Sequence, residues 1–83
     1  MAVEVLVGGL DSVRARALKV AVRQTIGEMR IPGVLRIAVL PSDAIDRWDV
    51  GVRRRGSGWS VTRFDSAAED LIARVTHTLR QTA

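Results

Sequence analysis

The stretch VRRRGSGWSV at residues 52–61 holds three consecutive arginines, Arg53, Arg54 and Arg55, beside a Gly-Ser-Gly turn and a tryptophan. A guanidinium group donates paired hydrogen bonds to phosphates and carboxylates, so this stretch is the first candidate for anion binding. The wider segment 47–63 carries five basic and one acidic side chain, a net charge of +4. It predicts either a nucleic-acid contact at the tip of a hairpin or an ordinary solvated turn.

A second basic segment covers residues 12–30, where five basic side chains and one acidic side chain again give a net charge of +4. Three of them, Arg16, Lys19 and Arg23, follow one another at helical spacing and predict a charged stripe along one helix. Such a stripe is a second candidate for nucleic-acid contact. It is also the usual solvent-facing side of an amphipathic helix.

Residues that commonly perform catalysis are sparse in this chain. His77 is the single histidine, and the absence of cysteine excludes thiolate chemistry and cysteine-ligated metals. Asp43, Asp46 and Asp49 are spaced by three, but they span a loop and the start of a strand, so we expect them to balance nearby arginines. We therefore expect no enzymatic activity, no cofactor and no metal site.

The length of 83 residues suits one small domain, residues 1–83. The N-terminal sequence lacks the basic region of a signal peptide, and no apolar run approaches the roughly 20 residues that cross a bilayer. These features predict a cytoplasmic protein without membrane contact.

The hydrophobic pattern predicts the element order β-α-β-β-β-α. Alternating β-branched residues indicate strands at 2–7, 34–40, 47–55 and 59–64, and apolar residues at steps of three and four indicate helices at 13–29 and 66–79. We expect the buried side of the first helix to be widened by Val13, Ala17, Val20 and Ala21. We expect Asp11 or Ser12 to cap this helix, and Ser66 with Glu69 to form a capping box on the second. The predicted fold class is α+β, a two-layer sandwich in which a four-stranded mixed sheet carries both helices on one face.

The register of the predicted hairpin decides where its side chains point, because a shift of one residue reverses every side chain. We expect a two-residue loop at 57–58, with Gly56 opposite Trp59. This register places one continuous apolar set on the helices: Trp48, Val50, Val52, Trp59 and Val61. Phe64 would then lie over Gly51 on the opposite face.

The sheet face away from the helices is expected to combine apolar side chains with arginines: Leu6, Arg36, Leu40, Arg53, Arg55 and Phe64. An uncovered face with an apolar centre and an arginine rim is a frequent contact surface between proteins. The leading interpretation is a non-enzymatic interaction module that self-associates as a homodimer, or binds another protein, through this face.

The alternative interpretation is nucleic-acid binding through the hairpin arginines and the basic stripe of the first helix. The α-β-β-β-α order over residues 12–82 resembles the double-stranded-RNA-binding domain. That resemblance implies a lysine cluster that contacts phosphate at the start of the last helix. This chain departs from the family there, because residues 65–70 read DSAAED.

Overall fold

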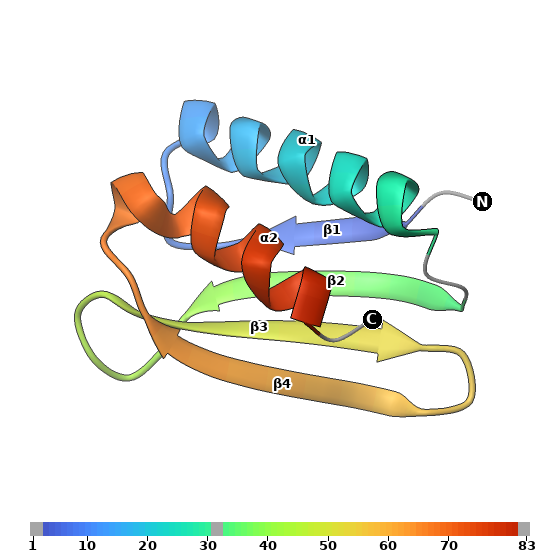
Figure 1. Cartoon of the computed structure of the whole chain (residues 1–83). Coiled ribbons are helices and arrows are strands. Elements are labelled where there is room, and N and C mark those ends of the chain that lie inside the picture. The colour runs from blue at the N-terminus through green and yellow to red at the C-terminus, as the bar shows by residue number, and fades with distance from the viewer. Residues whose placement is uncertain (1–2, 31–32, 82–83) are drawn as a thin grey trace.

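The computed structural model describes residues 3–30 and 33–81, so residue 2 of the first expected strand lies outside the described residues. The elements follow the predicted order: β1 (Glu4–Val7), α1 (Ser12–Met29), β2 (Val34–Pro41), β3 (Arg47–Arg54), β4 (Gly58–Asp65), the 3-10 turn η1 (Ala68–Asp70) and α2 (Leu71–Gln81). The strands lie in the order β1-β2-β3-β4, with β1 parallel to β2 and the other pairs antiparallel. Both helices cover one face of this sheet (Figure 1), which confirms the predicted α+β fold class.

The hydrophobic core lies between the helices and the sheet. α1 contributes Leu18, Val22 and Ile26, and α2 contributes Leu71, Val75 and Leu79, at steps of four. These side chains meet the inward-facing residues of the strands: Val5, Val34, Ile37, Val39, Trp48, Val50 and Val52. The alternation of these strand positions leaves the intervening side chains on the other face of the sheet.

α1 exposes apolar residues that the sequence pattern placed in the core. Val13 is 77% exposed, Val20 is 49% exposed and Ala17 is also exposed. The prediction that these residues widen the buried side is wrong. At 100° per residue they fall on the far side of the helix from Leu18 and Val22, which the sheet and α2 cover.

The two helices begin differently. Asp11 caps α1 as predicted, because its Oδ1 accepts a hydrogen bond of 2.9 Å from a backbone amide of the first turn. The capping box predicted at Ser66 and Glu69 does not form, since Ala67 precedes η1 and no side chain caps that turn. Instead the carbonyl of Ser66 accepts a hydrogen bond of 3.1 Å from the indole N–H of Trp48. This bond ties β3 to the chain that enters α2.

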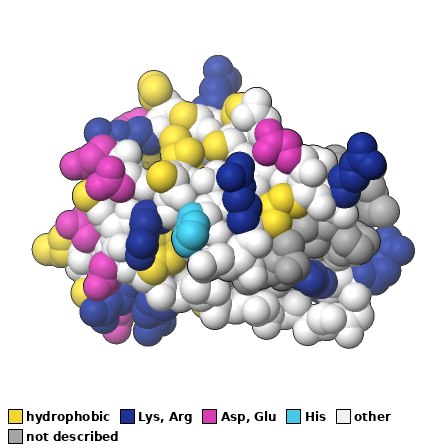
Figure 2. Space-filling view, viewed as in Figure 1, with side chains coloured by type: hydrophobic (Ala, Val, Ile, Leu, Met, Phe, Trp, Pro, Cys, Tyr) yellow, Lys and Arg dark blue, Asp and Glu magenta, His cyan; other side chains and the backbone are white. Residues whose placement is uncertain are grey.

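Charge is distributed unevenly along the strand direction. The end that holds the loop 42–46 and the start of both helices is called the loop end, and the end that holds the turn 55–57 is called the hairpin end. The loop end carries seven of the nine acidic residues and the four basic residues Arg14, Arg47, Arg63 and Arg74, a net charge of −3. Its acidic residues are Asp11, Asp43, Asp46, Asp49, Asp65, Glu69 and Asp70. Most of the acidic side chains visible in Figure 2 gather on the left.

The hairpin end carries the opposite charge. Two acidic residues, Glu4 and Glu28, accompany six basic ones there, a net charge of +4. The basic residues are Arg30, Arg36, Arg53, Arg54, Arg55 and Arg80. The domain is therefore strongly polarised from one end to the other.

Candidate functional site: the uncovered face of the sheet

The pairing of β3 with β4 decides which side chains reach the uncovered face, meaning the sheet face away from the helices. Arg54 pairs with Gly58, so residues 55–57 form a three-residue turn. The two-residue loop expected from the sequence is therefore wrong. Gly56 and Gly58 have positive φ angles of 80° and 69°, and three-residue hairpin turns use a left-handed position that glycine adopts readily.

This register reverses the expected faces of β4. Trp59 and Val61 point to the uncovered face, whereas Phe64 lies opposite Trp48 on the helix side. The prediction that Phe64 belongs to the interaction face is wrong. Its ring packs against the core, and the guanidinium carbon of Arg74 lies 5.4 Å from the ring centroid.

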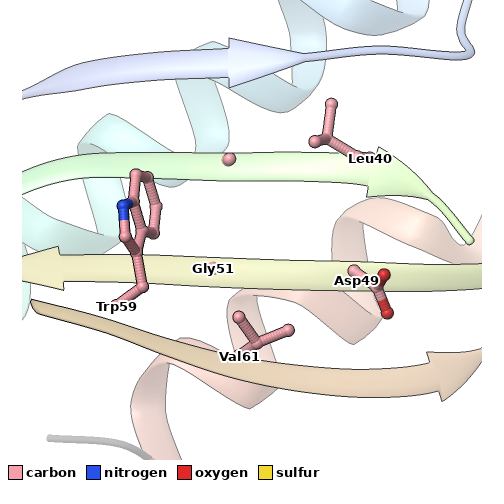
Figure 3. Close-up of a pocket in the computed structure, with 6 residues that line it drawn as sticks. Leu40, Asp49, Gly51, Trp59 and Val61 are labelled. Carbon is pink, nitrogen blue, oxygen red and sulfur yellow. The ribbon is translucent and has the colours of Figure 1, made fainter.

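An apolar centre occupies the uncovered face, with contributions from all four strands: Leu6, Ala38, Leu40, Gly51, Trp59 and Val61. Its four large side chains are between 42% and 62% exposed. The ring of Trp59 crosses β3 over Gly51, as Figure 3 shows. A hollow of about 270 Å³ lies beside the ring. The ring borders one end of this hollow, and Leu40 and Val61 line it further along the strands.

Cross-strand ion pairs surround this apolar centre: Asp49–Arg63 at 2.8 Å, Arg47–Asp65 at 3.2 Å and Glu4–Arg36 at 3.0 Å. The hydrogen bond from Arg63 holds the pKa of the Asp49 carboxyl below its usual value, and the same bond raises the pKa of Arg63. A hydrogen bond from the Ser42 hydroxyl likewise lowers the pKa of Asp43. Most charge on the uncovered face is thus neutralised by a neighbouring strand.

Arg53 differs from the other arginines of this face. It lies between Arg36 of β2 and Trp59 of β4, and none of the ion pairs found within residues 3–30 and 33–81 involves it. Its predicted place on the uncovered face is confirmed, as are those of Leu6, Arg36 and Leu40. Arg54 points to the helix side at the end of β3. The predicted place of Arg55 on the uncovered face is wrong, because β3 ends at Arg54 and Arg55 lies in the turn.

The basic stripe of α1 lies in the helical layer, on the other side of the sheet from Arg53 (Figure 1). Arg16 and Arg23 are exposed, and Lys19 is partly buried. The structure therefore does not bring the stripe and Arg53 onto one face.

The described part of the chain contains no group of three histidine, cysteine, aspartate or glutamate side chains that could hold a metal ion. Of the three aspartates expected to balance arginines, Asp43 lies 3.7 Å from Arg47 and Asp49 lies 2.8 Å from Arg63. None of the ion pairs among the described residues involves Asp46. His77 is exposed on α2. Neither described helix is long and apolar enough to cross a bilayer.

Sequence reasoning missed Trp59, Val61 and Asp49 as members of the uncovered face. One signal in the sequence could have identified them. Two strands that each carry alternating opposite charges, Arg47 and Asp49 on one and Arg63 and Asp65 on the other, match as antiparallel partners only in the observed register.

Comparison of this chain with models of known protein families gives no match, and comparison with curated proteins gives none either. Its function is therefore inferred from the surfaces described above.

Proposed function

We propose that this chain is a small non-enzymatic interaction module that self-associates through the uncovered face of its sheet. The observation that carries the proposal is the apolar centre, whose large side chains are between 42% and 62% exposed on one face. In an antiparallel sheet with one face in water, the side chains on that face are normally polar. A contiguous exposed apolar patch with a charged rim is typical of a protein contact surface.

The size of the face fits a modest dimer. Three strands of about 26 Å and one of about 13 Å, spaced by about 4.8 Å, give a flat area of roughly 440 Å². Two copies packed face to face would enclose about 900 Å², an area typical of weak, transient interfaces. We therefore expect a reversible dimer with a dissociation constant in the micromolar range.

The charges of the face favour a second copy as its occupant. Three cross-strand ion pairs neutralise six of its charged side chains, although the whole protein has a net charge of +4. Two such faces meet with much less repulsion than two copies of the arginine- and lysine-bearing surface of α1. Self-association through the sheet also leaves both helices free.

Analytical ultracentrifugation from micromolar to millimolar concentration tests this function. We expect wild-type protein to form a dimer and Trp59→Glu to remain monomeric at the same concentrations, because the substitution puts a charge into the apolar centre. Val13→Glu is the matched control: Val13 is 77% exposed on α1, and the dimer should persist. A wild-type protein that stays monomeric throughout would rule out the proposal.

A second candidate function is nucleic-acid binding by the hairpin, favoured by the exposure of Arg53 and Arg55 at the positively charged end. Removal of each arginine that contacts phosphate should lower the log–log salt slope of binding by about one. The triple variant Arg53→Ala/Arg54→Ala/Arg55→Ala should therefore bind a nucleic-acid duplex much more weakly than wild type. Equal binding by the two proteins would exclude this site.

A further inference from the structure

We infer that two copies associate antiparallel, with the hairpin end of each over the loop end of the other, so that Arg53 of one copy faces Asp49 of the second. This inference rests on the proposed self-association through the uncovered face. It adds the orientation of the two copies and the charged contact that fixes it.

Symmetry leaves two kinds of arrangement for a face-to-face homodimer. Its two-fold axis must lie in the plane between the two sheets, because each copy offers the same surface to the other. An axis along the strands places like ends over like ends. An axis across the strands places the hairpin end of each copy over the loop end of the other.

The charges of the uncovered face select between these arrangements. Near the hairpin end this face carries Glu4, Arg36 and Arg53, a net charge of +1, and near the loop end the charges of Arg47, Asp49, Arg63 and Asp65 sum to zero. An axis along the strands places the two positive ends together across a spacing of about 10 Å, which is close to the screening length at physiological salt. An axis across the strands places each positive end over the carboxylates of the second copy's loop end, which avoids that repulsion and favours this orientation.

The charged residues of β3 supply a specific contact in that orientation. Arg53 and Asp49 lie two residues on either side of Gly51, on the same strand and the same face. An axis that crosses the sheet over Gly51 therefore brings each Arg53 over the second copy's Asp49. The Asp49 side chain is 27% exposed beside Arg63, and a carboxylate has acceptor sites for both guanidinium groups.

The apolar centre is also asymmetric along the strand direction. Figure 3 shows the Trp59 ring on one side of the hollow, with Leu40, Asp49 and Val61 toward the other. Rotation about the same axis carries the ring of the second copy over this open half of the hollow. Each ring then covers apolar surface that one copy alone leaves exposed, so shape and charge point to the same orientation.

Charge reversal tests the orientation separately from self-association. Arg53→Glu alone and Asp49→Arg alone each create two repulsive contacts in an antiparallel homodimer, and each should raise the dissociation constant about tenfold or more at low salt. An equimolar mixture of the two variants should form a heterodimer as tight as the wild-type dimer, because both introduced charges then face their opposites. Native mass spectrometry distinguishes these species by mass. Arg23→Glu, on the exposed side of α1, is the control that should leave the dimer unchanged.

The outcomes separate the two proposals. Rescue in the mixture supports the antiparallel orientation. A wild-type dimer that Arg53→Glu leaves intact would overturn the orientation alone. A mixed dimer of Arg53→Glu with wild type that is tighter than the wild-type homodimer would show that Arg53 faces Arg53, and it would overturn the orientation as well. Wild-type protein that never dimerises would overturn self-association itself. Circular dichroism of each variant shows whether a weaker dimer results from loss of the fold.

Discussion

Trp59 lies across Gly51 so closely that a Cβ at residue 51 would sit 3.1 Å from the ring carbon Cε3 and 3.2 Å from Cζ3. The edge strand β4 thus folds the aromatic side chain of its uncovered face back over the neighbouring strand β3. An aromatic ring over a glycine shields the exposed backbone of a strand. Here it also builds one wall of the hollow in the proposed interface.

Gly51→Val should displace the Trp59 ring without unfolding the domain, because valine suits an extended strand. We expect weaker dimerisation and a red shift of Trp59 emission, measured in a Trp48→Phe background where Trp59 is the single tryptophan. Gly51→Ala is the graded control: its Cβ requires a shift of only a few tenths of an ångström, so both effects should be smaller. Unchanged emission in the valine variant would show that the ring does not rest on Gly51.

The Asp49–Arg63 pair should be visible as a pH effect. The pKa of Asp49 lies below its usual value of 3.8 when folded, first because Arg63 donates a hydrogen bond to it. A lowered pKa means that the pair adds stability above pH 3.8 and that this stability is lost as the pH falls through the folded pKa.

Arg63→Leu should therefore raise the pKa of Asp49 toward 3.8, measured by carboxyl carbon shifts in an NMR titration. Arg36→Leu removes an arginine of similar exposure that pairs with Glu4 instead, and it should leave Asp49 unaffected. If the Asp49 pKa is the same with and without Arg63, the pair does not persist in solution.

Arg30 ends α1 in a left-handed conformation, with φ 50° and ψ 45°. Glycine adopts this backbone without the steric cost that a side chain brings, and it is the usual residue at such helix ends. Arg30→Gly should therefore stabilise the domain by about 0.5–1 kcal/mol in chemical denaturation. Arg23→Gly, on the exposed middle of the same helix, should destabilise it by about 1 kcal/mol. Destabilisation by Arg30→Gly would show that the arginine side chain matters more than the backbone strain.

The order of elements could be predicted because each helix has a set of apolar residues at steps of three and four. The outward residues of β1 and β2 could also be predicted. Glu4, Leu6, Arg36 and Leu40 alternate with strongly apolar inward residues, so only one assignment of faces buries the apolar set.

The faces of β4 could not be predicted in the same way, because WSVTRF has apolar residues at both parities. One assignment of faces buries Trp59 and Val61, and the other buries Phe64. The first assignment buries more apolar surface, so the hydrophobic pattern favours it. The structure instead pairs Phe64 with Trp48. The helices leave the first half of β4 exposed on both faces, so Ser60 and Thr62 face the helix side at little cost.

The two tryptophans provide the last test, because they should differ sharply in their contribution to stability. Trp48 is 6% exposed in the core and donates a hydrogen bond of 3.1 Å to the carbonyl of Ser66, whereas Trp59 is 47% exposed. Trp48→Ala should cost about 3–5 kcal/mol, which is close to the whole stability of a domain with a margin of about 5 kcal/mol. Trp59→Ala should cost about 1–2 kcal/mol. Urea denaturation followed by circular dichroism, at concentrations below dimer formation, measures both losses. A nearly silent Trp48→Ala together with an unfolded Trp59→Ala would mean that the faces of the hairpin are reversed, and the apolar centre would then have to lie under the helices.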